Sequence, residues 1–157
     1  MDQIANYQDW ERNVPETLKT DALWSLKAYR LSLFVSDLCW SDTHKLERNP
    51  VTRPLSGQLY RAVGSIGANI AEGYSMSTGK NRARYYEYAL GSAREARDWY
   101  SKARHVLGPE VLDHRLSLLT QIVKLLLSTI PQQRTSKDRL REQPPPYPNS
   151  DSPMPDT

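Results

Sequence analysis

The sequence has little of what secreted or membrane-spanning proteins need. Cys39 is the only cysteine among 157 residues, so no disulfide can form within the chain, as is usual in a reducing cytosol. No apolar run reaches the roughly 18 residues that a membrane-spanning helix requires. The first residues also lack the basic and apolar regions of a signal peptide. We therefore expect a cytoplasmic protein that does not enter a membrane.

Residues that carry chemistry are also scarce. The three histidines, His44, His105 and His114, have no His or Cys partner at the helical spacing of a metal site. No Glu-x-x-His repeat of the di-iron bundles occurs, and no carboxylates are paired as in a glycosidase or protease. The sequence therefore predicts no metal site and no catalytic residue.

The stretch from Gly73 to Lys80 comes nearest to a nucleotide-binding loop. The Walker pattern reads G-x-x-x-x-G-K-[ST], but here five residues separate Gly73 from Gly79, and Asn81 follows Lys80. The stretch also follows a helical pattern rather than a strand. We therefore predict no nucleotide hydrolysis, no cofactor and no enzyme activity.

What the sequence does contain is apolar residues that recur every three or four positions, which is the period of an α-helix. This period predicts helices at about 21–41, 55–74, 79–107 and 110–130. No segment shows the alternation of a strand. We therefore predict an all-α protein, an antiparallel up-down four-helix bundle.

The two ends of the chain lack this period. Residues 1–20 form an N-terminal arm of mixed character, and Pro131 is expected to end the last helix. Residues 132–157 are rich in proline and poor in apolar residues, which predicts a disordered tail. Such a tail is more often a solvating segment than a docking ligand.

The first helix, which Asp21 is suited to cap, carries two apolar stripes. The main stripe has the spacing of residues that pack against the other helices of a bundle. A second set of apolar residues projects to the opposite face and comprises Leu26, Tyr29, Leu33 and Trp40. A single bundle does not need two such faces, so the second is covered either by the N-terminal arm or by another subunit. We favour another subunit, which predicts a homo-oligomer that assembles through this face.

The second helix contains Gly64, Gly67 and Gly73, each of which weakens a helix by about 1 kcal/mol relative to alanine. This helix therefore depends on tertiary packing. Asn69 and Glu72 lie beside its apolar stripe. They form either a functional site or a polar network that fixes the helix pairing, and we favour the network.

Positive charge is concentrated in the middle of the chain. Residues 43–107 carry eleven Lys or Arg and five Asp or Glu, a net charge of +6, whereas residues 1–42 carry −3. Basic residues alternate with tyrosines near the start of the third helix, a mixture suited to phosphate contact and base stacking. The candidate nucleic-acid-binding residues are Arg61, Lys80, Arg82 and Arg84. A solvated helical surface is the alternative.

The turn that precedes the third helix also has two interpretations. Ser77 or Thr78 caps the helix in the simpler one. In the other, the free backbone N–H groups at the start of the helix bind an anion.

Three segments resemble a known family: SIGANIAEG at 65–73, RYYEYA at 84–89 and GSARE at 91–95. Together they are similar to the bacterial four-helix-bundle proteins encoded in intervening sequences of large-subunit ribosomal RNA genes. The resemblance extends over about residues 23–134, although the family commonly has proline where Gly67 stands here.

The resemblance implies a homo-oligomer, typically a pentamer, in a family that mostly has no established activity. A related branch, the accessory proteins of diversity-generating retroelements, is basic and is thought to bind nucleic acid and a reverse transcriptase. The leading hypothesis is therefore a non-enzymatic, oligomeric binding protein whose partner is RNA or a nucleoprotein. The alternative is a structural or protein-interaction scaffold with no nucleic-acid role.

Overall fold

The structure is a computed structural model that describes residues 6–136. Its helices in chain order are α1 (Tyr7–Asn13), α2 (Glu16–Lys19), the 3-10 helix η1 (Ala22–Ser25), α3 (Lys27–Glu47), α4 (Arg53–Tyr74), α5 (Gly79–Leu107) and α6 (Pro109–Thr135). Residues 6–136 contain no strand, which confirms the all-α class. The predicted proline-rich tail lies almost entirely outside the described residues.

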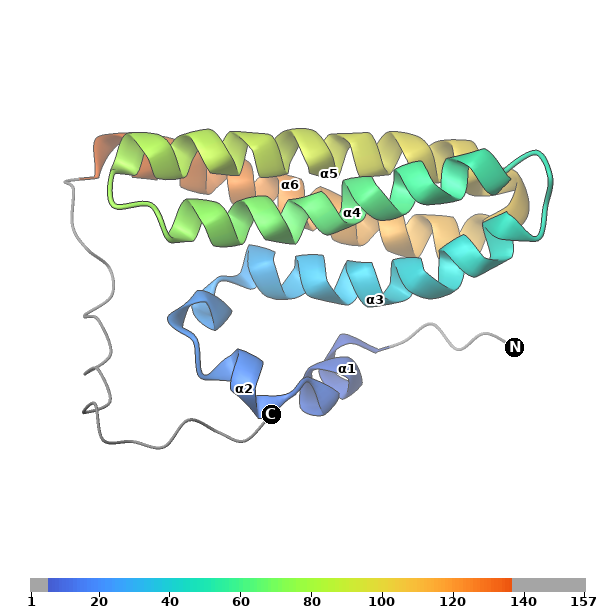
Figure 1. Ribbon diagram of the computed structural model, residues 1–157, viewed down its shortest axis with the longest axis horizontal. Coiled ribbons are helices and arrows are strands. Elements are labelled where there is room, and N and C mark those ends of the chain that lie inside the picture. Colours follow the sequence, from blue (N-terminus) through green and yellow to red (C-terminus); the bar gives the residue numbers. More distant parts are fainter. Residues whose placement is uncertain (1–5, 137–157) are drawn as a thin grey trace, which may run out of the picture.

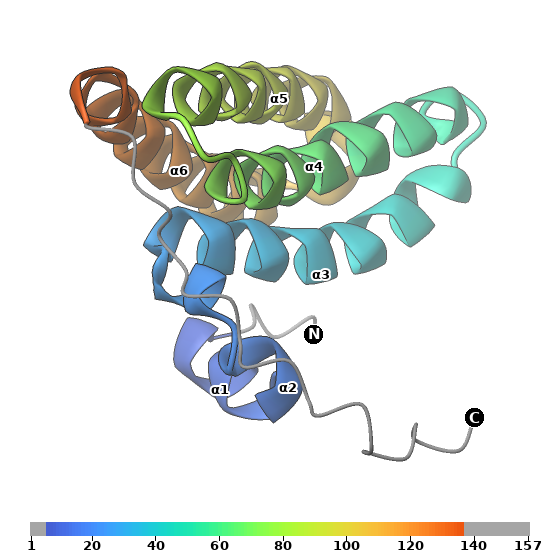
Figure 2. The same cartoon turned by 60° about the vertical axis from the view of Figure 1, so that its left-hand side comes forward.

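The four long helices, α3 to α6, lie side by side, and α5 packs between α4 and α6 (Figure 1). The connector between α3 and α4 and the turn between α5 and α6 lie at one end, which we call the loop end. The turn between α4 and α5 and the last residues of α6 lie at the other, which we call the open end. The short helices α1 and α2 lie outside this body, beside α3 (Figure 2).

The apolar stripes predicted from the sequence face one another in the core. Residues that are almost fully buried come from all four long helices, among them Leu31, Val35, Leu59, Val63, Ile66, Ile70, Tyr86, Tyr100, Leu119, Ile122 and Leu126. The stripe of α5 also contributes Ala89, Ala93, Ala96 and Ala103, whose small side chains let neighbouring helices approach closely. Burial of these apolar surfaces is the main force that holds the helices together.

α5 begins and ends where the sequence predicts. The Thr78 hydroxyl accepts a hydrogen bond from the Asn81 backbone N–H at 3.2 Å, so Thr78 is the N-cap. Gly108 follows the last helical residue with a φ of 81°, a conformation that glycine adopts without strain.

The first long helix differs from its predicted range of 21–41. Asp21 caps η1 instead, because its carboxylate accepts from the Leu23 N–H at 2.8 Å, and α3 starts only at Lys27. α3 then continues to Glu47, past the predicted end of the helix at residue 41. It continues because Asp42 and Leu46 extend its buried stripe by two further turns.

The last helix is longer than its predicted range of 110–130. Pro131 lies inside α6 and does not end it. A proline removes one N–H from the helix ladder, and the unpaired carbonyl belongs to Leu127, which is on an exposed face where water can replace the bond. Beyond it, Gln133 is buried and bonded to Arg82, which holds the last turn in place.

Two of the glycines in α4 permit close contact with a neighbouring helix. A Cβ atom at Gly67 would lie 2.8 Å from the Ser32 hydroxyl, and one at Gly73 would lie 2.8 Å from the Tyr86 ring. A Cβ atom at Gly64, in contrast, would meet no atom within 4 Å beyond the adjoining backbone of its own helix. Packing therefore accounts for Gly67 and Gly73, and no contact among the described residues requires a glycine at position 64.

The N-terminal arm covers part of the outer face of α3. Tyr7 and Trp10 pack against the buried Phe34, with ring centroids 5.4 and 5.2 Å from that of Phe34. The Trp10 indole N–H also donates to the Asp37 carboxylate at 2.6 Å. The arm thus occupies the side of α3 around Phe34 and Asp37.

Candidate functional site

A groove opens on the surface at the open end, between the first turns of α5 and the last turn of α6. It has a volume of about 630 Å³. Its lining residues are Lys80, Asn81, Ala83, Arg84, Glu87, Tyr88 and Arg134. We call it the basic groove. It brings together two of the four predicted nucleic-acid-binding residues, Lys80 and Arg84, with a tyrosine and a further arginine.

The local sequence explains this grouping. Residues 80, 84, 87 and 88 follow the three- and four-residue steps of one helical face, so they line one wall of the groove. Arg134 comes from α6, which approaches α5 here because Gly79 has no side chain. A Cβ atom at Gly79 would lie only 2.2 Å from the Gln133 backbone oxygen.

Within the groove, Arg84 and Tyr88 hold each other in place. The Arg84 Nε–H donates to the Tyr88 hydroxyl at 2.6 Å, and this hydrogen bond raises the pKa of Arg84. Tyr85 packs edge-on against the Tyr88 ring, with centroids 5.6 Å apart and an interplanar angle of 80°. Arg84 therefore remains cationic at any ordinary pH, and the Tyr88 ring is fixed from two sides.

The charges of the groove do not cancel. Arg134 forms an ion pair with Glu87, and both side chains are exposed. Within the described residues, no carboxylate forms an ion pair with Lys80 or Arg84. Three cations and one anion leave the groove with a net charge of +2.

The prediction that Arg82 contacts a nucleic acid at the surface is wrong. Arg82 is 1% exposed. Its guanidinium donates to the Gln133 side-chain oxygen at 2.9 Å and to the backbone oxygens of Met76 and Ser77 at 2.9 and 3.0 Å. Arg82 therefore joins the turn before α5 to the end of α6, and it has a structural role.

Arg61, the remaining candidate, does not reach the groove. It is exposed on α4, 13 residues before Tyr74. At about 1.5 Å per residue this places it roughly 20 Å along the helix from the open end. The structure therefore separates Arg61 from Lys80 and Arg84.

The predicted network of Asn69 and Glu72 is also not formed. The Asn69 amide donates to the Ser65 carbonyl of its own helix at 2.8 Å, and Glu72 is exposed to solvent. Neither side chain connects α4 to another helix through a hydrogen bond. The prediction that this pair fixes the helix packing is therefore wrong.

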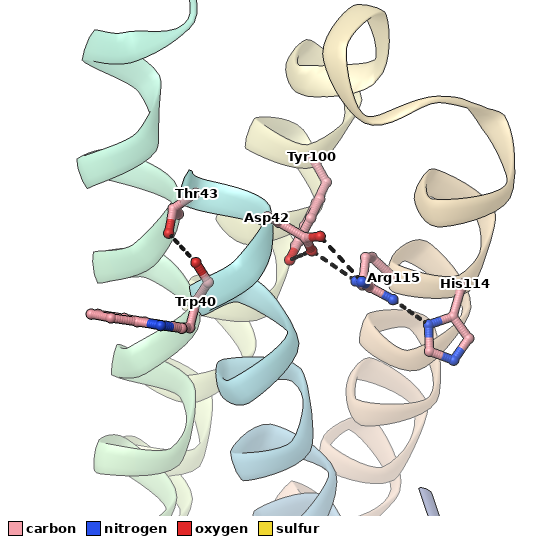
Figure 3. Close-up of polar contacts among 6 residues, drawn as sticks. All are labelled: Trp40, Asp42, Thr43, Tyr100, His114 and Arg115. Atoms are coloured by element: carbon pink, nitrogen blue, oxygen red, sulfur yellow. Dashed lines mark hydrogen bonds and ion pairs between the residues drawn. The ribbon is translucent and has the colours of Figure 1, made fainter. Parts of the chain in front are cut away.

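A different buried polar network, which was not predicted from the sequence, lies at the loop end (Figure 3). The Asp42 carboxylate accepts two hydrogen bonds from Arg115, at 2.7 and 3.1 Å, and one from the Tyr100 hydroxyl at 2.9 Å. The side chains of Arg115 and Asp42 are 7% and 1% exposed. This network joins α3, α5 and α6.

The titratable groups around this network respond to burial. Burial raises the pKa of Tyr100 well above its usual value and raises the pKa of the neighbouring Cys39 thiol to about 12. Burial and the Arg115 charge lower the pKa of His114, whose Nδ1 accepts a hydrogen bond from Arg115 at 2.6 Å. Cys39 and Tyr100 are therefore protonated at neutral pH, and the network serves as a structural connection between helices.

The residues predicted to form an oligomer interface differ in exposure. Leu26, Tyr29 and Leu33 are half-buried, whereas Trp40 is 58% exposed. Tyr29 and Leu33 line a shallow groove of about 130 Å³ between α3 and α4, together with Gly64. The Trp40 ring packs against exposed Tyr60 of α4, with centroids 6.0 Å apart.

Two kinds of feature are absent from residues 6–136. No group of three His, Cys, Asp or Glu side chains lies together there in a way that could hold a metal ion. None of the helices in this range is both long enough and apolar enough to cross a membrane.

Comparisons with known proteins agree on one family. The family described as "23S rRNA-intervening sequence protein" matches residues 25–128, which is more than half of the chain. A crystal structure from Bacteroides thetaiotaomicron, of a protein with unknown function from the S23 ribosomal protein family, superimposes with a TM-score of 0.62. It is 25% identical in sequence, and the alignment covers 66% of this chain and 97% of that one. No curated protein matches the sequence. The family match includes Lys80, Arg84 and Tyr88 but not Arg134.

Proposed function

The chain belongs to the 23S rRNA-intervening sequence protein family, and from this premise we propose that it is a non-enzymatic binding protein whose basic groove contacts RNA or a ribonucleoprotein. One observation carries the proposal. Lys80, Arg84 and Arg134 gather from two helices around an exposed tyrosine, with one carboxylate to offset them. Cations of this kind attract phosphates, and an aromatic ring beside them offers a surface for a base.

The architecture of the protein in solution is part of the same proposal. The long helices form an antiparallel up-down four-helix bundle, and copies of it associate into a homo-oligomer, a pentamer as the resemblance implies. The exposed Trp40 and the shallow groove beside Tyr29 and Leu33 support this association. Several basic grooves on one assembly would then bind one RNA with avidity.

The test compares two pairs of charge-removing substitutions on α5. Fluorescence anisotropy measures the affinity of the full chain for a labelled single-stranded RNA of about 12 nucleotides, a length within the site sizes of single-strand binders. K80Q/R84Q removes two cations from the groove. R94Q/R97Q removes two exposed cations of the same helix that do not line the groove.

We expect K80Q/R84Q to weaken binding about tenfold or more and R94Q/R97Q to weaken it about threefold or less, because only the first pair contacts phosphates. Equal losses in the two variants would show that binding depends on overall charge and would refute the groove. Absence of binding by the unsubstituted chain at low salt would refute RNA binding altogether.

One observation favours a second function, that of a protein-interaction scaffold. Trp40, Tyr60 and Val51 are exposed on neighbouring parts of α3, α4 and their connector, and large exposed apolar residues are typical of protein interfaces. Light scattering of the unsubstituted chain and of W40Q tests this surface. A lower mass for W40Q supports self-association through Trp40, and an unchanged mass contradicts it.

A further inference from the structure

We propose that the basic groove binds unpaired, single-stranded nucleotides, with one base stacked on Tyr88 and the adjoining phosphates held by Lys80 and Arg84. This inference rests on the proposed function, since it names the form of nucleic acid that the same groove accepts. It goes further because it assigns the selectivity for single strands to one side chain.

The first argument is the position of Tyr88. Its side chain lines the groove, and the residue is 46% exposed, although a tyrosine ring is largely apolar. Tyr86, two positions earlier on the same helix, is 1% exposed and belongs to the core. The helix thus presents one tyrosine to the core and another to the groove, where the ring is next to cations.

The second argument is the way in which the ring is fixed. Arg84 contacts the hydroxyl at 2.6 Å, while its guanidinium carbon is 5.6 Å from the ring centroid. The guanidinium therefore lies over the ring toward its hydroxyl end, in a cation–π contact that helps to hold the ring. A ring that is already held by Arg84 and Tyr85 loses little conformational entropy when a base stacks on it.

The third argument concerns the form of the nucleic acid. In a duplex the bases stack on one another, so a protein ring can reach none of their faces without unpairing them. A single strand exposes its bases, and stacking on an aromatic ring beside cations is the usual way in which proteins bind it. Among the described residues, Asn81 is the only amide side chain that lines the groove, so hydrogen bonds that distinguish one base from another are few. The groove therefore selects single strands with little preference for sequence.

The test measures the affinity of the full chain for three probes at one salt concentration. The probes are the labelled RNA of about 12 nucleotides, the same RNA annealed to its complement, and inorganic polyphosphate, which has phosphates but no bases. The variants are Y88L, which removes the ring, and Y88F, which keeps the ring and removes only the hydroxyl. Circular dichroism shows that each variant is folded, which is expected at an exposed position.

We expect the single strand to bind about tenfold or more tightly than the duplex. We expect Y88L to weaken single-strand binding by about tenfold, to leave polyphosphate binding unchanged, and to remove most of the difference between single strand and duplex. Y88F should stay within about threefold of the unsubstituted chain, because the ring face remains. Photocrosslinking of iodouridine-substituted RNA should yield an adduct at Tyr88.

Two results would overturn the inference. If Y88L binds the single strand as tightly as the unsubstituted chain, while K80Q/R84Q has lost affinity, the groove holds phosphates but no base. The proposed function would then stand without this extension. If the duplex binds as tightly as the single strand, selectivity for single strands is refuted in the same way. If neither Y88L nor K80Q/R84Q changes the affinity, the proposed function fails together with the inference.

Discussion

The two ends of the long helices use the same kinds of residue in opposite ways. At the loop end, Arg115 of α6 and Tyr100 of α5 are buried, and both are bonded to Asp42. At the open end, Arg134 of α6 and Tyr88 of α5 are exposed and line a groove. Arg115 at the loop end is satisfied inside the protein, whereas Lys80, Arg84 and Arg134 at the open end are available to a ligand.

Desolvation explains why the difference matters. A buried guanidinium is tolerated only when a carboxylate and further hydrogen bonds replace the water that it has lost. An exposed guanidinium keeps its water and can exchange it for a phosphate at little cost. Burial therefore distinguishes arginines that build this protein from arginines that can bind a ligand.

The same distinction between buried and exposed arginines applies to Arg82 and Arg84, which are only two positions apart on α5. Arg82 and Arg84 are separated by about 200° around the helix, since each residue advances it by about 100°. Arg82 consequently points between α5 and α6, where Gln133 and two carbonyl oxygens bond to it. Arg84 points to the groove.

The largest effect is expected at the loop end. Arg115→Ala leaves the Asp42 carboxylate buried without its cation, which costs about 3–5 kcal/mol of the free energy of unfolding. Urea denaturation measures this loss. The double variant D42L/R115M buries no charge and should be more stable than Arg115→Ala. A loss below about 1 kcal/mol for Arg115→Ala would show that the network does not hold the helices together.

The next effect separates Arg82 from Arg84 on α5. Arg82→Gln removes the hydrogen bonds that the guanidinium donates to the Gln133 side-chain oxygen and to the backbone oxygens of Met76 and Ser77, at a cost of about 1–3 kcal/mol. Arg84→Gln changes an exposed residue, so its stability should remain within about 0.5 kcal/mol of the unsubstituted chain. Thermal and urea unfolding of the two variants check the contrast. Equal stabilities would contradict the assignment of Arg82 to structure and of Arg84 to the groove.

Two glycines of α4 provide a similar contrast of filled and open surroundings. Gly73→Ala should destabilise the protein by about 1–3 kcal/mol, because the new methyl group collides with Tyr86. Gly64→Ala should stabilise an isolated chain by about 1 kcal/mol, because the new methyl group meets no atom beyond the adjoining backbone of its own helix and alanine favours a helix. A loss of stability or of assembly in Gly64→Ala would instead show that another copy packs against this groove between α3 and α4.

The smallest effect is a dependence on pH at the loop end. In the folded protein the pKa of His114 lies below its usual value of 6.5, because burial and the Arg115 charge disfavour protonation. The unfolded chain therefore takes up this proton first, and the stabilising contribution, present above pH 6.5, is lost as the pH falls through the lower folded pKa. Unfolding experiments at neutral and mildly acidic pH should show the loss, which His114→Gln should reduce. The same dependence in His114→Gln would assign it to other groups.

Much of the core and part of the groove could be predicted from the sequence. The three- and four-residue steps gave the stripes of the long helices, and Thr78 and Gly108 marked the ends of α5. Lys80, Arg84 and Tyr88 share one helical face by their spacing alone. These features are local, so the helical period is sufficient to find them.

Other features could be predicted only by extending the buried stripe of a helix so that it includes a charged residue. Arg82 lies one turn before Tyr86 on the buried stripe of α5, and Asp42 lies one turn after Leu38 on that of α3. Two charges on apolar stripes were a visible signal of buried polar contacts. These buried contacts were not predicted because Arg82 was interpreted as a surface residue and because the first long helix was predicted to end at residue 41, before Asp42.

The remaining features are tertiary and could not be derived from spacing. Arg134 reaches the groove because α6 approaches α5 at Gly79. α6 continues past Pro131 because Gln133 is held by Arg82. In both cases a contact between residues distant in the sequence overrides the local rule.

The dependence of RNA affinity on salt tests the central claim most directly. If Lys80, Arg84 and Arg134 each replace one counterion, the logarithm of the association constant should fall with the logarithm of salt concentration with a slope of about −2 for a single strand. K80Q/R84Q should reduce the size of that slope by about 1.4. A slope near zero in the unsubstituted chain, or the same slope in both proteins, would contradict the account of the basic groove.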